Sequence, residues 1–365
     1  MKTMLTTFLL VYLKTIACAS QNNAIHQSVT IAFYNLENLF DYDDDPLIFD
    51  DDRTPQGRDQ WTEAKYRRKL NNMGRVIKNI GSKNSDHAPA IVGVCEIENE
   101  KVLQDLVRTQ ALAPYRYAFE HFDSPDRRGI DVALLYQPHQ FKTIWSKKIP
   151  VFIFDRIHTS RRIFTRDQLL VYGLLSGEPI YILVNHWPSR SGGQEASEYR
   201  RQKAADVTKH IKDSLLNMDP KAKIVIMGDF NDNPDDNSIK NILKAHAKVK
   251  QLTHDNLYNP LAKLYAMGYG SLAFNDRWFL FDQIITTKSL VHSPKTSWHL
   301  MTSGIYNPPY LQQPDGPYKF YPYRSVQGGR FTGGYSDHYP VYIQMIRERP
   351  EDLVQPLLPR QAAQN

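Results

Sequence analysis

Short apolar runs recur along the chain, rich in β-branched and aromatic residues, and most of them end at a polar residue. Runs of this length and composition are typical of strands buried in a sheet. We therefore predict strands at 29–34, 90–95, 131–136, 180–184, 223–227, 278–285 and 339–345.

Between some of these strands, apolar residues recur at the spacing of an amphipathic helix. The first predicted helix carries Tyr66, Leu70, Met73, Ile77 and Ile80, and Gly81 stops it. The second runs from Tyr199 to Leu215, ahead of Pro220. Strands that alternate with helices indicate a layered α/β domain with its helices outside the sheets. We find neither an internal repeat nor a linker that would split the domain.

Polar residues stand at the ends of several strands or in the loops just beyond. They are Asn35, Glu96, His186, Asp229, Asn231, Asp282, Asp337 and His338. If those ends cluster at one edge, the side chains converge where layered α/β folds place their ligand sites. Carboxylate and amide oxygens suit Mg²⁺ or Mn²⁺ better than zinc. A hard divalent ion with two imidazoles is suited to phosphate-ester hydrolysis.

Each of these signals has a structural alternative. GDFND at 228–232 fits a turn with local hydrogen bonds, and SDH at 336–338 fits a helix cap or a turn. His186 on its own fits a core histidine. The combination is more specific than any of its parts.

The combined motifs resemble the endonuclease/exonuclease/phosphatase superfamily, which is DNase I-like. The matching segments are YNLEN (34–38), CEIEN (95–99), DVALLY (131–136), NHWPSR (185–190), GDFND (228–232), FDQII (281–285) and YSDHYPV (335–341). The resemblance covers about residues 29–346. It implies a four-layered α/β sandwich of two packed mixed sheets flanked by helices. Within the superfamily, the motifs are most similar to those of bacterial secreted or periplasmic members.

The resemblance also implies roles. Glu96 would be the principal ligand of Mg²⁺ (or Mn²⁺), with Asn35 nearby. Asp337 would help to hold the ion, orient His338, or both. His338 would act on water or phosphate with Asp229, and Asn231 would donate to a phosphate oxygen. His186 would be the second imidazole, oriented by Asp282. Which imidazole is acid and which is base stays open.

Other charged and aromatic residues carry weaker expectations. Arg166 and Arg190 flank the motifs and would bind a substrate phosphate, and ion-paired arginines are the alternative. Arg161, Arg162 and Arg166, with Lys147 and Lys148 upstream, form a basic neighbourhood that could track a polyanion. We interpret it as a solvated face rather than a nucleic-acid groove, because no aromatic residues interleave it. The acidic loop 41–52 lacks an EF-hand pattern. The tyrosine-rich segment 305–324 either packs as a loop or overhangs the site.

Residues 1–20 have the layout of a secretory signal: Lys2, an apolar run at 4–13 and then small residues. The run is too short to span a bilayer. Cleavage near ACAS and lipid attachment at Cys18 compete, and a buried N-terminal helix is the third alternative. We expect export to the periplasm, the cell surface or the medium, with any membrane contact made through a lipid on Cys18.

Composition and charge exclude few further classes of protein. The 365 residues carry 45 basic and 39 acidic side chains, so the formal charge is 45 − 39 = +6. Removing residues 1–20 takes away Lys2 and Lys14 and leaves 6 − 2 = +4, which permits polyanion binding without identifying it. Two cysteines exclude a disulfide-stapled class, and 23% charged residues give no sign of general disorder.

The sequence thus predicts a signal at 1–20, a catalytic domain at 25–347 and a tail at 348–365. The expected function is a metal-dependent phosphodiesterase, foremost an exported nuclease acting on DNA or RNA, with no obligate protein partner. The alternatives are a lipid or small-molecule phosphodiesterase or phosphatase, and a catalytically silent surface-binding protein.

Overall fold

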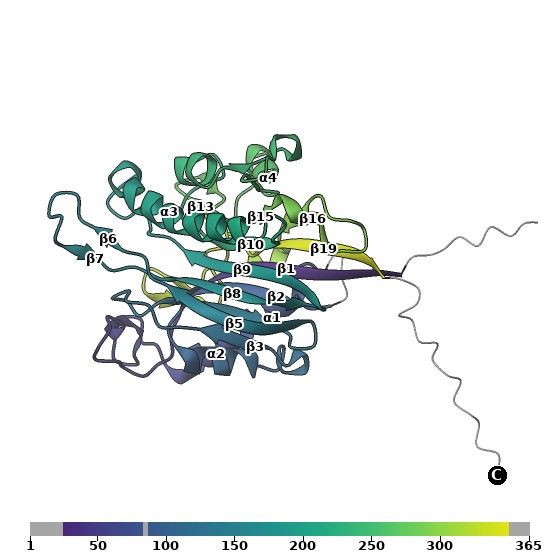
Figure 1. Cartoon of the computed structure of the whole chain (residues 1–365). Helices are drawn as coiled ribbons and strands as arrows, with labels where there is room; N and C mark the ends of the chain where they lie inside the picture. Colours follow the sequence, from purple (N-terminus) through teal and green to yellow (C-terminus); the bar gives the residue numbers. More distant parts are fainter. Residues whose placement is uncertain (1–24, 83–86, 350–365) are drawn as a thin grey trace, which may run out of the picture.

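The strands of the computed structural model, which describes residues 25–82 and 87–349, form two large mixed sheets (Figure 1). The first sheet has the order β16 (His299–Ile305), β19 (Val341–Arg349), β1 (Ile25–Leu39), β2 (Ile91–Ile97), β4 (Asp131–Tyr136), β3 (Ala118–His121). The second has the order β11 (Ala245–His246), β12 (Leu257–Tyr258), β15 (Asp282–Thr287), β10 (Ile224–Asp229), β9 (Glu178–His186), β8 (Gln168–Leu175), β5 (Phe141–Ile149).

Smaller elements decorate these sheets. Three hairpins pair β6 (Ile153–Phe154) with β7 (Arg162–Ile163), β13 (Leu272–Phe274) with β14 (Arg277–Phe279), and β17 (Val326–Gln327) with β18 (Arg330–Phe331). The α-helices are α1 (Glu63–Asn79), α2 (Glu100–Val107), α3 (Gln194–Met218) and α4 (Ala262–Ala266). Short helical turns lie at η1 (Asp51–Arg53), η2 (Ala113–Tyr115), η3 (Ser238–Ile242), η4 (Val249–Gln251), η5 (Lys288–Leu290) and η6 (Pro309–Leu311).

Three apolar clusters hold the layers together. Strand β1 shows why: Ile31 and Phe33 point into the cluster between the sheets, whereas Ala32 and Tyr34 point into the cluster under α1 and α2. This alternation follows from the two-residue period of a strand. A third cluster packs α3 on the outer face of the second sheet. The predicted four-layered α/β sandwich is therefore confirmed.

The structure corrects the extent of several predicted elements. The run 278–285 is not one strand, because Leu280 and Phe281 separate β14 from β15. Helix α3 is longer than the predicted 199–215, and β3, β5, β8 and β16 had not been predicted. The predicted signal, with Cys18, lies outside the described residues, as does most of the predicted tail. Within the described part of the chain, no helix is long and apolar enough to span a bilayer.

Candidate functional site

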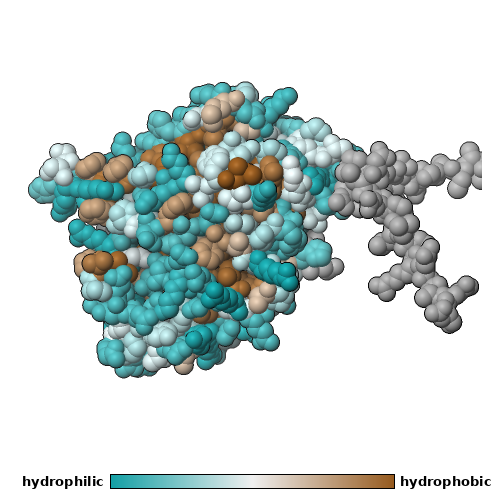
Figure 2. Space-filling model, turned by 60° about the horizontal axis from the view of Figure 1, so that its bottom comes forward, coloured by the Kyte–Doolittle hydropathy of each residue, from teal (hydrophilic) through white to brown (hydrophobic). Residues whose placement is uncertain are grey.

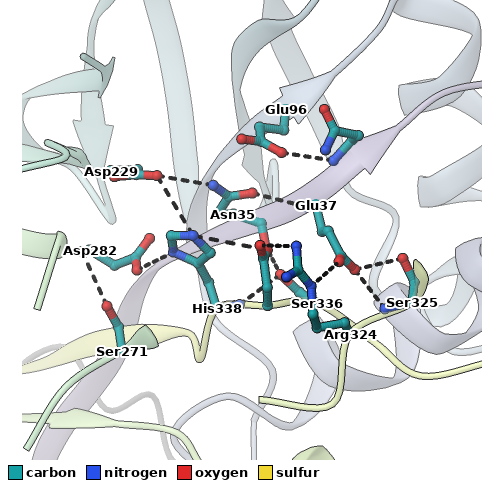
Figure 3. A network of polar contacts seen from close by, with 12 residues as sticks. Asn35, Glu37, Glu96, Asp229, Ser271, Asp282, Arg324, Ser325, Ser336 and His338 are labelled. Carbon is teal, nitrogen blue, oxygen red and sulfur yellow. Dashed lines mark hydrogen bonds and ion pairs between the residues drawn. The ribbon is translucent and has the colours of Figure 1, made fainter. Parts of the chain in front are cut away.

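The polar strand ends meet at one edge of the two sheets. In the second sheet, the register of parallel β9 and β10 sets His186 beside Asp229, and antiparallel β15 sets Asp282 beside the same Asp229. In the first sheet, parallel β1 and β2 carry Asn35 and Glu96. The Asn35 Nδ2 donates to Asp229 Oδ2 over 3.1 Å and so links the two sheets (Figure 3).

The backbone at this edge is strained. The angle φ is 50° at Glu37, 53° at Asn38, 59° at Glu96 and 51° at Asn231. Side chains other than glycine adopt this left-handed region at a cost, which Asn bears better than Glu. Strain of about 1–3 kcal/mol per residue persists only where the surrounding structure enforces it, and it clusters at functional sites.

His338 is held by Asp282. Its Nδ1 lies 2.6 Å from Asp282 Oδ2, and its Nε2 lies 3.9 Å from both Asp229 Oδ2 and Asp337 Oδ1 (Figure 3). Burial alone would lower the pKa of His338, but the charges of Asp282, Asp337 and Asp229 raise that pKa well above its usual value. The imidazole is therefore a cation in this arrangement.

The expected pairing of Asp282 with His186 was wrong. Asp282 starts β15, from which its carboxylate reaches the histidine that follows Asp337 rather than the one at the end of β9. Asp337 does not orient the ring either, because 3.9 Å exceeds a hydrogen bond.

His186 lies in a different environment. Its Nε2 is 3.8 Å from Glu96 Oε1 and 3.8 Å from Asp229 Oδ2, and its buried Nδ1 has no hydrogen-bond partner. Burial, followed by the positive charges of Arg166 and Arg128, lowers the pKa of His186 well below its usual value. This imidazole is therefore neutral.

The carboxylates of the site fit a hard divalent cation. Glu96 Oε2 accepts from the Asn38 amide at 2.9 Å, and Asp337 Oδ2 pairs with Arg324 at 3.0 Å. In the described structure, the second oxygen of each carboxylate accepts no hydrogen bond, so each keeps a free lone pair for an ion. Oxygen donors of this kind suit Mg²⁺ and Mn²⁺.

Other donor atoms lie close by. Cys95, His186 and Asp229 offer ligand atoms within 4.8 Å of one another, and so do Asp229, Asp282 and His338. The sequence interpretation had left Cys95 out of the site. Burial raises the pKa of its thiol well above the usual value, and a sulfur donor suits softer metals better than Mg²⁺ or Mn²⁺.

The two predicted amides are used within the protein. Asn35 Oδ1 accepts from the Glu37 amide at 2.9 Å, while its Nδ2 holds Asp229. Asn231 donates one amide hydrogen to the Trp187 carbonyl at 3.0 Å and keeps the other. Asn35 is thus foremost a link between sheets, and Asn231 retains one donor.

The two predicted substrate-binding arginines are ion-paired. Arg166 is buried and lies 3.0 Å from Asp126, and it also donates to the Trp187 carbonyl. Arg190 lies 3.1 Å from Asp232 and 2.6 Å from Asp236. The structure therefore favours the ion-paired alternative, in which both residues brace the loops that follow β9 and β10.

Sequence reasoning missed a second ionic cluster beside the site. Glu37 accepts from the Ser325 amide and hydroxyl, each at 2.6 Å, and pairs with Arg324 at 3.2 Å (Figure 3). Lys69 of α1 is fully buried and donates to the Glu37 carbonyl at 2.5 Å. Burial lowers the pKa of Lys69 to about 8. The sequence did hold a signal for this buried charge, because Lys69 lies between Tyr66 and Leu70 on the apolar face of α1.

The interpretation of the basic neighbourhood also needs correction. Phe152, Phe154 and Phe164 are exposed among Arg161 and Arg162 in the segment around β6 and β7. Aromatic residues therefore do interleave these cations.

The fold and the clustered carboxylates and imidazoles define a phosphoesterase site. A model described as the Endonuclease/Exonuclease/phosphatase family matches residues 30–347, and the chain belongs to this family. Its members are hydrolases that act on phosphoesters and generally use divalent metals. A search of curated proteins found no match.

Several solved structures share the fold. Truncated TDP2 of Caenorhabditis elegans has a TM-score of 0.53 and 12% identity, over 87% of this chain and 97% of that one. TDP2 of D. rerio complexed with a single strand DNA product has a TM-score of 0.50 and 14% identity, over 87% and 98%. A family member from Bacteroides thetaiotaomicron has a TM-score of 0.51 and 16% identity, over 89% and 97%. At such identities the likeness shows the fold alone.

Proposed function

We propose that this protein is a divalent-metal-dependent phosphodiesterase whose substrate is nucleic acid. The observation that carries the proposal is the convergence of the carboxylates of Glu96, Asp229 and Asp337 with two imidazoles, those of His186 and His338. The single strand DNA product bound by the similarly folded D. rerio protein supports nucleic acid as the substrate class.

The metal would be Mg²⁺, with Mn²⁺ as the alternative, held by Glu96 and Asp337 near Asn35. When bound, it neutralises charge on the phosphoryl group and favours attack by water. Each remaining contribution comes from the protein's own side chains.

Three side chains divide the proton chemistry. Burial raises the pKa of Asp229 to about 7, so its carboxylate is poised to accept a proton from water near neutral pH. The His338 imidazolium, fixed through Nδ1 by Asp282, presents Nε2–H to a phosphate oxygen or to the leaving oxygen. His186 is neutral and its Nε2 is free to accept or donate one hydrogen bond to the substrate.

A substrate panel tests this function. Wild type and His338→Ala would be incubated with plasmid DNA, single-stranded DNA, RNA, sphingomyelin and an inositol polyphosphate, each with Mg²⁺, Mn²⁺ or EDTA. We expect metal-dependent cleavage of a nucleic acid that EDTA abolishes and excess metal restores. Cleavage of sphingomyelin or the inositol phosphate alone would establish the small-substrate alternative, and no hydrolysis at all would establish a silent binding protein.

We also propose that the protein is exported, on the basis of the basic, apolar and small-residue order of residues 1–20. Mass spectrometry of the mature N-terminus tests this. A start among residues 18–21 supports export, with a lipid mass on Cys18 indicating an anchor, and an intact Met1 would refute it.

A further inference from the structure

The β6–β7 hairpin projects beyond the edge of the sheets that carries the site (Figure 1, left). Its side chains alternate between two faces. Val151 and Ile153 are buried in the cluster under α3, whereas Phe152 and Phe154 are 57% and 48% exposed. Inward residues thus fix the hairpin to the domain, and its aromatic face is left to solvent.

Arginine side chains lie among the exposed rings. The register pairs Phe154 with Arg162, so both point to the same face. The Arg162 guanidinium carbon lies 4.5 Å from the Phe152 ring centre and 4.9 Å from that of Phe164, and Arg127 approaches Phe164 to 5.5 Å from the loop before β4. Residues 150–165, which exclude the buried Arg166, carry three Arg and one Asp, a net charge of 3 − 1 = +2.

Buried contacts join the segment that carries this aromatic and cationic face to the site. Phe164 is two residues before Arg166, which donates to the carbonyl of Trp187, the residue after His186. On the other side, Arg127 is followed by Arg128, whose charge acts on His186. Figure 2 shows the projecting end of the surface as hydrophobic residues set among hydrophilic ones.

We propose that this hairpin face, formed by Phe152, Phe154, Arg162 and Phe164, binds a single-stranded stretch of nucleic acid that continues into the site. Aromatic rings and guanidinium planes stack on unpaired bases, and the cations attract the backbone phosphates. Such a face suits unpaired bases because a duplex keeps its ring faces stacked inside. The inference rests on the proposed function, since it supposes a polynucleotide substrate.

The tip of the hairpin argues against insertion into a membrane. Ile157 is 85% exposed at this tip, but Asp155 pairs with Arg161 at 2.5 Å beside it, and Arg156 and His158 are exposed there too. Burying this tip in hydrocarbon would desolvate several charged groups. A polyanion leaves them hydrated and gains from the positive charge.

The test measures binding and chemistry separately. Binding of a fluorescein-labelled 12-nucleotide oligo(dT) to the full chain would be followed by anisotropy in EDTA. Hydrolysis of bis(p-nitrophenyl) phosphate with Mn²⁺ would be measured on the same preparations. The variants are Phe152→Ala with Phe154→Ala, the corresponding double tyrosine variant, and Met301→Ala, an exposed hydrophobic residue on β16, as the control.

We expect the double alanine variant to bind the oligonucleotide about 5- to 100-fold more weakly, as for the loss of base stacking. The tyrosine variant should retain binding because it keeps the rings, Met301→Ala should match wild type, and small-substrate hydrolysis should be unchanged in all three.

Unchanged oligonucleotide affinity in the alanine variant would overturn the inference. So would an equal loss of hydrolysis, which would place the effect in the site, or a loss of binding to phosphatidylcholine–phosphatidylglycerol vesicles alone, which would indicate a membrane. If wild type hydrolyses no phosphodiester with any metal, the proposed function fails whatever the oligonucleotide result.

Discussion

The two histidines of the site approach the same oxygen of Asp229, at 3.8 Å from His186 Nε2 and 3.9 Å from His338 Nε2, but their environments differ. Around His338 the neighbours are charged. Asp282 lies 2.6 Å from the ring and Asp337 lies 3.9 Å from it, and Arg324 pairs with Asp337. Around His186 the ring is buried, its Nδ1 has no partner, and the carboxylates of Glu96 and Asp229 come no nearer than 3.8 Å, while the charges of Arg166 and Arg128 lower its pKa.

The contrast shows how one cluster holds an acid and a neutral donor at the same pH. Carboxylates in contact keep a proton on one imidazole, while burial beside cations removes it from the other. Sequence alone leaves the two residues equivalent, and the difference comes from their neighbours.

The largest expected effect is on catalysis. His338→Ala and His186→Ala should each lose on the order of a hundredfold or more in kcat, because each removes a positioned proton donor or acceptor. Steady-state kinetics on the best substrate of the panel would measure this, with exposed His254→Ala as the control. Near wild-type kcat in either site variant would remove that histidine from the chemistry.

The next effect is on stability and concerns Arg166, whose charge acts on His186. Arg166→Met leaves Asp126 buried without its main partner, which should cost about 3–5 kcal/mol of unfolding free energy. Arg161→Ala breaks an exposed pair with Asp155 that solvent screens, so it should cost much less unfolding free energy than Arg166→Met. Urea unfolding of both variants makes the comparison, and equal losses would show that the Arg166 pair is no tighter than a surface pair.

A smaller effect should come from Asp282→Asn. Removing this charge lowers the pKa of His338, since the carboxylate favours the protonated ring, and should leave the pKa of His186 unchanged. Ring nitrogen NMR of the EDTA-treated protein would follow both titrations, and the rate should fall about 10- to 100-fold, as when an orienting partner is lost. A shift at His186 instead would contradict the pairing seen here.

The smallest effect should be that of Arg324→Ala. Arg324 joins Glu37 and Asp337, but its side chain is 52% exposed, so solvent screens the pairs. We expect a loss of less than about 1 kcal/mol in unfolding free energy, measured by urea titration. A loss of several kcal/mol would mean that Glu37 depends on this arginine more than on Ser325.

The sequence predicted the edge of the site better than its internal pairing. Period and strand length located Asn35, Glu96 and Asp229, because buried strands leave a plain apolar signal that ends at a polar residue. The partner of Asp282 was mispredicted, since the reach of a side chain across two sheets is not encoded in spacing. Lys69 was missed because a helix pattern averages over positions and hides one buried charge.

The exposed hairpin shows a different limit. Phe152 and Phe154 look like ordinary strand residues in the sequence, and only the register shows that they share a face with Arg162. Pattern reasoning favours the core, so it overlooks aromatic residues that point outward.

The pairing of β1 with β19 has a consequence for when the protein can fold during its synthesis. The register joins Ile25 to Arg349 and Phe33 to Val341, so β1 cannot form this pairing until the long stretch of chain between the two strands has been made. Contacts this distant along a chain form slowly and late. Because His338 lies just before β19, a growing chain cannot assemble the candidate site until the residues up to β19 have been made. For the exported nuclease that we propose, this delay would keep the site unassembled, and the chain able to pass unfolded through a translocation channel, while it is still inside the cell.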